Sequence, residues 1–318
     1  RAHMARIAGK LAAEEESWNA LFLEWSEANP ERAELLRRGM NRQDLTLELD
    51  ELTALLSEDE ATRVSSGKIL NHIAKKTPFL FGGSADLAPS NNTVIENGRS
   101  FSCENPAGQT IHFGVREFAM AAMANGIALH GVLRPYVATF FVFSDYMKSA
   151  VRLSALMKLP VIYILTHDSI GVGEDGPTHQ PIEQLLMFRS IPGLKVFRPA
   201  GREETAAAWY MALQNNGPSV LVLSRQKVFS SETSACDALR GAYIIRDGGE
   251  KPDVLLMASG SEVSVTLSAA DQLKQEGISA RVVSFLSMEV FEQQGEAYKD
   301  LVLPPALRKR VAVEAGTP

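Results

Sequence analysis

Two kinds of hydrophobic pattern divide this chain of 318 residues. Over residues 1–60 the apolar positions recur at helical spacing, and one helical face carries four large apolar side chains. These are Trp18, Leu21, Phe22 and Trp25. We expect this helix to end at Asn29-Pro30, because the residue before a proline is pushed out of the α region. A single stripe cannot enclose a core, so the pattern predicts a helical connector that packs on another domain.

From residue 61 onward, short apolar runs alternate with helical patterns. The predicted strands span 78–82, 110–114, 160–166 and 219–224, and the predicted helices span 63–76, a segment from 117 onward, and 202–214. The continuous apolar run at 160–166 is typical of a strand covered on both faces. Strands separated by helices are joined by crossovers, so the pattern predicts an α/β fold in which a parallel sheet has helices on both faces.

A change in composition near residues 230–236 precedes a second α/β segment. Its predicted strands span 253–258, 280–285 and 310–314, with a helix at 262–275. The chain stops at Gly316-Thr317-Pro318, which reads as a loop, so we expect this second domain to be incomplete. The predicted organisation is a connector at 1–60, a domain at 61–235 and the start of another at 236–318.

Composition excludes several classes of function. There are 32 Lys and Arg against 38 Asp and Glu, a net charge of −6, so no basic face for nucleic acid is predicted. Two distant cysteines, Cys103 and Cys236, argue against a disulfide framework and favour a reducing cytoplasm. No apolar run reaches the ~18 residues of a membrane helix, so no membrane association is expected. No Gly-x-Gly-x-x-Gly turn follows a first strand, which argues against a dinucleotide-binding dehydrogenase.

Polar residues follow four predicted strands. They are Asp86, Arg116-Glu117, His167-Asp168 and Arg225. A charged residue after a strand is more often a solvated loop or a helix cap. Ligands of open parallel sheets bind beyond the carboxyl ends of the strands, however, so four such positions together predict one binding rim.

The most informative segment is the loop over residues 166–181. Three glycines within six residues allow close backbone approach to a ligand, and His167, Asp175 and His179 lie in the same loop. A purely structural loop would not need two histidines beside these acids. The spacing matches no usual zinc pattern, so no metal ligand is predicted in this chain.

This loop closely resembles the signature of the transketolase family of thiamine diphosphate enzymes. Further motifs resemble those of the family and occur in the family's order. They are Phe81-Gly-Gly-Ser-Ala-Asp-Leu-Ala-Pro-Ser90, His112-Phe-Gly-Val-Arg-Glu117, Thr139-Phe-Phe-Val-Phe-Ser-Asp-Tyr146, Val151-Arg-Leu-Ser-Ala-Leu156 and Leu223-Ser-Arg-Gln226. The resemblance runs from about residue 10 to the last residue. It implies the thiamine diphosphate-binding fold, with a pyrimidine-binding domain followed by the start of the family's C-terminal domain.

The resemblance also implies how the cofactor is held. Glu117 would be catalytic and hydrogen-bond N1′ of the aminopyrimidine ring, and Asp86 would help to orient the cofactor. An aromatic pocket around the pyrimidine would be formed by Phe140, Phe143 and Tyr146. By spacing alone these three residues are most simply core.

The activity implied by the resemblance is reversible transfer of a two-carbon ketol unit from a ketose phosphate, such as xylulose 5-phosphate, to an aldose phosphate, such as ribose 5-phosphate. Asp175 would bind the hydroxyl next to the aldehyde carbon, and the catalytic His179 would contact the donor. The sugar-phosphate grip would consist of Arg63, Ser90, His167 and Arg225. Arginine suits phosphate because its fork donates two hydrogen bonds at once.

The sequence lacks the Gly-Asp-Gly motif with which the family's N-terminal domain binds Mg²⁺ or Ca²⁺ and the diphosphate. The resemblance therefore implies that this chain supplies half of a site, completed by the diphosphate-binding domain of a second subunit in a homodimer, and is inactive alone. A proteolysed enzyme, a deliberate fragment and one subunit of a split enzyme remain open, and the incomplete C-terminal domain argues against the last. Two other readings also remain: a relative of dihydroxyacetone synthase, which uses formaldehyde as acceptor, and a non-catalytic interaction module.

Overall fold

The computed structural model describes residues 1–42, 45–228 and 234–317, and the chain divides into two compact units at residues 46 and 47. The smaller unit consists of α1 (Ala2–Ala28) and α2 (Pro30–Met40). As predicted, the first helix ends before Pro30. The proline then opens α2, because a first-turn residue needs no amide hydrogen. On α1, Trp18 stacks on Phe22 at 5.1 Å between ring centroids and remains 55% exposed.

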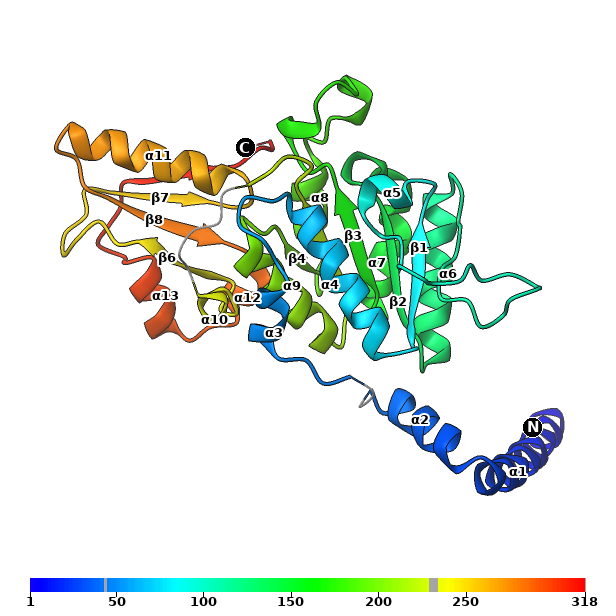
Figure 1. Ribbon diagram of the computed structural model, residues 1–318. Coiled ribbons are helices and arrows are strands. Elements are labelled where there is room, and N and C mark those ends of the chain that lie inside the picture. The colour runs from blue at the N-terminus through cyan, green and yellow to red at the C-terminus, as the bar shows by residue number, and fades with distance from the viewer. Residues whose placement is uncertain (43–44, 229–233, 318) are drawn as a thin grey trace. The chain divides into compact units, whose positions relative to one another are not determined.

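The larger unit contains a five-stranded parallel sheet in the order β1-β2-β3-β5-β4 (Figure 1). Its strands are β1 (Leu80–Ser84), β2 (Arg134–Phe140), β3 (Ile162–Thr166), β4 (Lys195–Phe197) and β5 (Ser219–Leu223). The pairing register aligns Phe140 with Thr166, and Thr166 with Leu223. The carboxyl ends of the central strands therefore meet at one edge.

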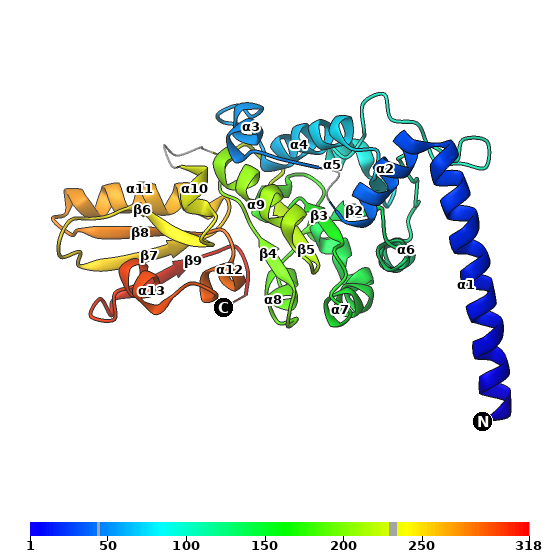
Figure 2. The ribbon, with the colours of Figure 1, turned by 90° about the horizontal axis from the view of Figure 1, so that it is seen from below.

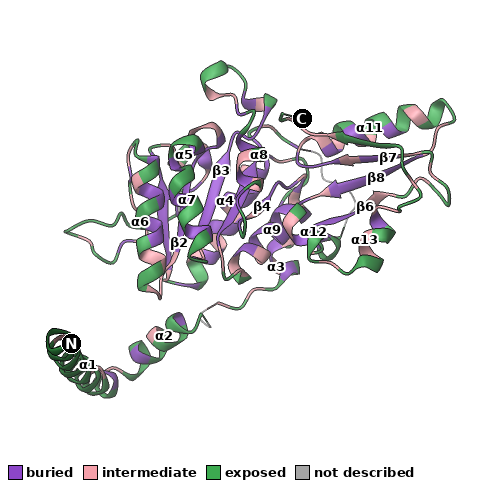
Figure 3. Cartoon of the chain, turned by 180° about the vertical axis from the view of Figure 1, so that it is seen from behind, coloured by how far each residue is buried: buried purple, intermediate pink, exposed green. Residues whose placement is uncertain are grey.

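Helices cover both faces of this sheet, as predicted. Figure 2 shows α4 (Thr62–Lys76) and α9 (Arg202–Gln214) on one face. The other face carries α6 (Glu117–His130), α7 (Lys148–Leu156) and α8 (Gln184–Arg189). Every residue of β1, β3 and β5 is buried, and Figure 3 shows β3 in the colour of buried residues. Shorter elements are α3 (Leu49–Ala54), α5 (Ala88–Asn91), α10 (Ala235–Ala238) and the 3₁₀ turns η1 (Phe141–Met147), η2 (Ile170–Val172) and η3 (Pro177–His179).

The helix α3 lies inside the segment 1–60 that the pattern groups as a connector. In the structure it belongs to the larger unit, where it contacts α9 and α10. Among the described residues, no helix is both long enough and apolar enough to cross a membrane.

The predicted strand at 110–114 is wrong. Residues 109–111 hydrogen-bond to β1 at Gly82, and within the described chain Thr110 forms only two isolated bridges, to Gly82 and to Ser100. The strand that pairs with the other side of β1 is β2, which the pattern does not predict. Its apolar run is interrupted by Thr139 and begins at Arg134-Pro135, and a proline is tolerated in a strand only near its start or at an edge.

A second sheet has the order β6-β8-β7-β9. Its strands are β6 (Ala242–Arg246), β7 (Val254–Ala258), β8 (Ala280–Phe285) and β9 (Arg310–Val313). The sheet is mixed because β6, which the pattern missed, runs antiparallel to β8. Apolar residues of α11 (Glu262–Gln275) pack on one face, and those of α12 (Met288–Glu292) and α13 (Glu296–Val302) pack on the other. We call residues 234–317, with this sheet, the second domain.

Gly82 provides a test of the pairing between β1 and β2. A Cβ atom at this position would collide with the main-chain carbonyl oxygen of Tyr136 in β2. We expect Gly82→Ala to lower the free energy of unfolding by about 3 kcal/mol, since neither backbone can yield inside the sheet. Urea denaturation of the chain measures this change.

The matched control is Gly126→Ala in α6, where an added Cβ meets no atom within 4 Å. Alanine there should stabilise the helix by about 0.5–1 kcal/mol. Equal effects of the two substitutions would contradict the close approach of the two strands.

Candidate functional site

The site residues lie where the strands of the first sheet end. Asp86 follows β1, Phe140 ends β2, His167 follows β3 and Arg225 follows β5. Asp86 and His167 both have a φ of +61°, in the left-handed region that side chains with a Cβ rarely adopt. Such backbone conformations persist where the surrounding structure holds them, as often happens at binding sites.

A row of aromatic rings, the aromatic wall, is formed by Phe140, Phe143 and Tyr146. Phe140 is 6% exposed and stacks on His167 with 3.6 Å between ring centroids. The ring centroid of Phe143 lies 6.0 Å from that of Phe140, 6.5 Å from that of Tyr146 and 5.2 Å from that of His179. Tyr146 is 66% exposed, so the wall runs from the protein interior to its surface. The structure thus brings three predicted cofactor residues together with the two histidines of the glycine-rich loop, residues 167–183.

Three cationic or titratable groups form a second cluster, the cationic cluster: Arg63, His167 and Arg225. Arg63 donates a hydrogen bond from Nη1 to the main-chain carbonyl of Ser90, and its buried Nε has no partner among the described residues. Burial lowers the pKa of Arg63, and the nearby Arg225 lowers it further. No carboxylate forms an ion pair with either guanidinium in the described parts of the chain. Two close guanidinium groups without a counter-ion make a site for an anion.

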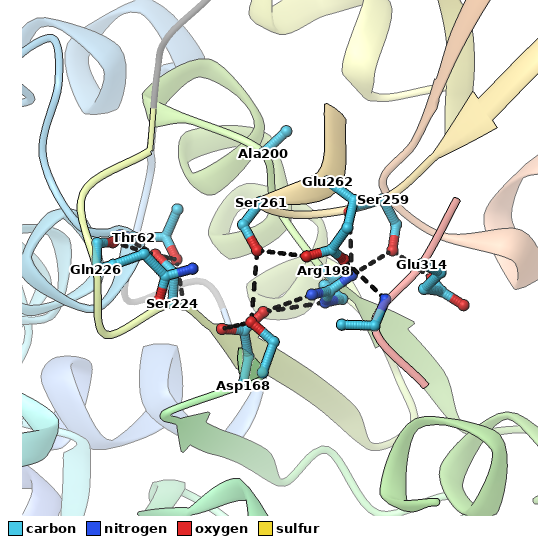
Figure 4. Close-up of polar contacts among 12 residues, drawn as sticks. Thr62, Asp168, Arg198, Ala200, Ser224, Gln226, Ser259, Ser261, Glu262 and Glu314 are labelled. Carbon is cyan, nitrogen blue, oxygen red and sulfur yellow. Dashed lines mark hydrogen bonds and ion pairs between the residues drawn. The ribbon is translucent and has the colours of Figure 1, made fainter. Parts of the chain in front are cut away.

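Hydrogen bonds at the end of β5 explain why the two arginines are close. The main-chain amide of Thr62 donates to Ser224 Oγ at 3.0 Å, and the amide of Ser224 donates to Thr62 Oγ1 at 2.8 Å (Figure 4). Arg63 and Arg225 are the next residues along each chain segment. This reciprocal pair therefore places the two guanidinium side chains at the same corner of the sheet.

His167 is buried at the centre of this arrangement, with only 4% of its surface exposed. Its Nδ1 lies 2.8 Å from Thr166 Oγ1. Burial lowers the pKa of His167 to about 4, and Arg63 and Arg225 add to the effect while Asp175 opposes it. The ring is therefore neutral at pH 7.

Glu117 is the first residue of α6, and 8% of its surface is exposed. In the part of the chain that the structure describes, its carboxylate has no hydrogen-bond or ion-pair partner. A carboxylate at this position is stabilised by the helix dipole, and its oxygens are available to a donor from a ligand. Within that same part, no hydrogen bond, ion pair or ring contact joins Glu117 or Asp86 to the aromatic wall. They share its edge of the sheet, since α6 packs on β2 and η1.

Asp168 differs from its neighbours on the rim. It is 3% exposed and accepts hydrogen bonds from Arg198 at 3.0 and 2.8 Å, so its carboxylate is committed to the protein. The sequence pattern did not identify Arg198, because that residue follows β4, a strand of three residues that the pattern missed. Asp175, by contrast, is exposed within the glycine-rich loop.

Comparisons with known proteins identify related sequences. Residues 58–230 match the family model described as the transketolase pyrimidine-binding domain, and residues 241–318 match that of the transketolase-like C-terminal domain. The transketolases of Aquifex aeolicus (strain VF5) and Bacillus subtilis (strain 168) are each 48% identical to this chain. The matches cover 95% of this chain in both cases, but 44% and 46% of the relatives. The chain thus spans about half the length of the curated relatives it matches.

Solved structures give the same result. The transketolase from Leishmania mexicana superposes with a TM-score of 0.91 and 40% identity, over 97% of this chain and 46% of that chain. A structure described as a split-gene transketolase, an inactive beta4 tetramer, has a TM-score of 0.64 and 28% identity, over 80% of this chain and 78% of that chain.

The pKa of His167 is a direct test of the cationic cluster. Since folding lowers it from 6.5 to about 4, the unfolded chain binds the proton more readily between these values. The contribution to stability is therefore present above pH 6.5 and is lost as the pH falls through about 4. NMR titration of the ring C–H resonances, assigned with His167→Gln, should give a midpoint near 4. Arg63→Leu should raise that midpoint, whereas a midpoint at 6.5 in the unaltered chain would contradict the geometry.

Proposed function

Because the chain belongs to the transketolase family, we propose that it supplies the pyrimidine-binding half of a site that transfers a two-carbon ketol unit between sugar phosphates. The donor would be a ketose phosphate such as xylulose 5-phosphate, and the acceptor an aldose phosphate such as ribose 5-phosphate. The observation that carries this proposal is the position of Arg63 and Arg225, which have no carboxylate partner among the described residues, near His167, which itself stacks on the aromatic wall. One surface thus combines an anion site with an apolar ring-binding site.

The residues present fit thiamine diphosphate. Glu117, a buried residue whose carboxylate has no partner among the described residues, suits a protonated ring nitrogen of the aminopyrimidine, and the aromatic wall suits the faces of that ring. When bound, thiamine diphosphate supplies a carbon nucleophile and an electron sink for cleavage of the bond between C2 and C3 of a ketose.

The protein's part would be to bind, orient and move protons. Glu117 would hold a proton at N1′ of the pyrimidine as a positioned acid–base group. Phe140 and Phe143 would exclude water from the ring, and Asp86 would orient it. His179, whose ring lies against Phe143, would exchange a proton with a hydroxyl of the donor.

Substrate recognition would use the other half of the rim. Arg63, His167 and Arg225 would hold the sugar phosphate, with the Ser90 carbonyl fixing the Arg63 side chain. Asp175 would accept a hydrogen bond from the hydroxyl next to the aldehyde carbon. A formaldehyde-using relative of dihydroxyacetone synthase would not need this cluster for its acceptor, so the cluster favours sugar phosphates.

A divalent cation, Mg²⁺ or Ca²⁺, would hold the diphosphate. Among the described residues no group of three or more His, Cys, Asp or Glu side chains could bind a metal. Ligands for the cation would therefore come from a diphosphate-binding domain. The fraction of the relatives that this chain covers, 44–46%, leaves room for such a domain.

The outer face of α6 supports docking of that domain from a second subunit in a homodimer. Phe118, Met123 and Leu129 are each more than half exposed, on a helix whose other face is also apolar. A helix that is apolar on all sides is normally buried, so this face would be covered by a partner. In the cell such an enzyme would act in the cytoplasm, in the pentose phosphate pathway.

Glu117 gives the first test. In an enzyme that joins this chain to a diphosphate-binding half, Glu117→Gln keeps the shape of the side chain but loses the carboxylate. We expect kcat to fall by about 10²–10⁴, the usual contribution of a positioned acid–base group. Glu204→Gln, which alters a buried glutamate bonded to Tyr243 and Ser284, is the control and should leave kcat unchanged. Full activity of Glu117→Gln would remove this residue from the mechanism.

Arg225 tests the substrate class. A charge-assisted contact contributes about 1.5–3 kcal/mol, so Arg225→Ala should raise KM for a phosphorylated ketose by about tenfold or more. KM for an unphosphorylated ketose should hardly change. Steady-state kinetics with both donors measure the difference, and Lys227→Ala, an exposed neighbouring cation, is the control. Equal losses for the two donors would exclude a phosphate-binding role.

A further inference from the structure

The second domain holds the start of the glycine-rich loop through a buried ion pair. Arg198 is 1% exposed, and its Nε and Nη2 both donate to Oδ2 of Asp168 (Figure 4). Its Nη1 donates to the main-chain carbonyl of Ser259 at 3.0 Å, to Ser259 Oγ at 3.1 Å, and to Glu262. Ser259 and Glu262 belong to the second domain, whereas Asp168 directly follows His167. One guanidinium therefore joins the two sheets at the site's edge.

The end of the same loop is also tied to the second domain. Arg189, in the helix α8 that follows the loop, forms two hydrogen bonds with Glu314 at 2.6 and 2.9 Å. Glu314 accepts from Ser259 Oγ, and the amide of Ala315 donates to Glu262 at 3.1 Å. Asp168, near the start of the loop, and Arg189, in the helix after it, thus connect to one network. We call these side chains, with Arg198, Ser259, Glu262 and Glu314, the ionic clamp.

The position of Arg198 leaves little freedom. Gly260 has a φ of +55°, and a Cβ atom there would lie 2.8 Å from both Cζ and Nε of Arg198. The backbone of Arg198 is fixed as well, because its amide donates to Leu286 and its carbonyl accepts from Gly260. The packing against Gly260 and the two main-chain hydrogen bonds therefore fix Arg198 on the side of the second domain, independently of its contact with Asp168.

On the side of the first sheet, the ionic clamp contacts the chain directly after His167. His167 has a left-handed backbone, which is unfavourable for a residue with a Cβ and persists only when neighbours fix it. Asp168 is its next residue, and Ser169 Oγ donates to Asp168 Oδ1 at 3.0 Å. Together these contacts fix the chain immediately beyond His167.

We propose that the Arg198–Asp168 ion pair is a positioning device, through which the second domain fixes the backbone of His167 and keeps its ring on Phe140. Arg198 is a positioning residue, since it contacts the loop and not the substrate. The proposal rests on the proposed function for the role of His167 in phosphate binding. A buried ion pair often adds little net stability compared with apolar residues, so its geometry is the property that this site would use.

The test compares three variants of the joined enzyme. Arg198→Lys keeps the charge but loses the fork, and the double variant Arg198→Met with Asp168→Leu replaces the pair without leaving a buried charge. We expect both to raise KM for a phosphorylated ketose on the order of tenfold, as a displaced binding group does, with a much smaller change in kcat. The matched control is Arg281→Met, which removes a second-domain arginine that is 9% exposed and bonds to Asp247 and Leu301. It should leave KM unchanged.

A double-mutant cycle separates positioning from general loss of stability. If Arg198 acts through His167, Arg198→Lys should have no further effect on KM in a His167→Gln background. Additive effects, or an equal rise in KM for Arg281→Met, would overturn the proposal.

A second readout does not depend on activity. In the chain itself, Arg198→Lys should shift the His167 ring resonances in the NMR spectrum, because the ring moves relative to Phe140, and Arg281→Met should not. Unchanged resonances in Arg198→Lys would overturn the proposal. An unaltered enzyme that is inactive toward phosphorylated ketoses would contradict the proposed function and leave this readout to decide the role of Arg198.

Discussion

Parallel pairing in register is the constraint on which the candidate site depends. Because β2, β3 and β5 end at the same level, residues separated by up to 85 positions in sequence, such as Phe140 and Arg225, meet at one edge. Hydrogen bonds between Thr62 and Ser224, just beyond the end of β5, set Arg63 near Arg225. A slip of one residue in any of these pairs would reverse the faces of a strand and disperse the rim.

The site also contrasts a buried cation that has carboxylate partners with a half-buried cation that has none among the described residues. Arg198 is buried deeply but meets Asp168 and Glu262, so its charge is compensated within the protein. Arg63 has no carboxylate partner in the described chain and instead lies near the exposed guanidinium of Arg225. An uncompensated pair of cations costs free energy in the free protein, and that cost is returned when an anion binds. His167, near both arginines, is neutral and therefore adds no third positive charge.

Elements whose apolar residues recur at regular spacing could be predicted from the sequence. Elements that are defined by their pairing with distant parts of the chain could not. The helix at 262–275 and the strand at 280–285 have the predicted bounds, because their apolar positions follow one period throughout. The strand β2 was missed and 110–114 was wrongly taken for a strand, since pairing with β1 is decided by neighbours and not by local pattern. Most rim residues could be located because chemistry follows strand ends. The contact of Asp168 with Arg198 could not be predicted, because Arg198 follows a strand too short to show a pattern.

We propose that this chain forms one half of a thiamine diphosphate site. The most direct measurement is a coupled assay of xylulose 5-phosphate with ribose 5-phosphate, in the presence of thiamine diphosphate and Mg²⁺. It would be run on the chain alone and on the chain mixed with a separately produced diphosphate-binding half. We expect ketol transfer only in the mixture. Activity of the chain alone, or none in a mixture in which both parts are folded and bind each other, would contradict it.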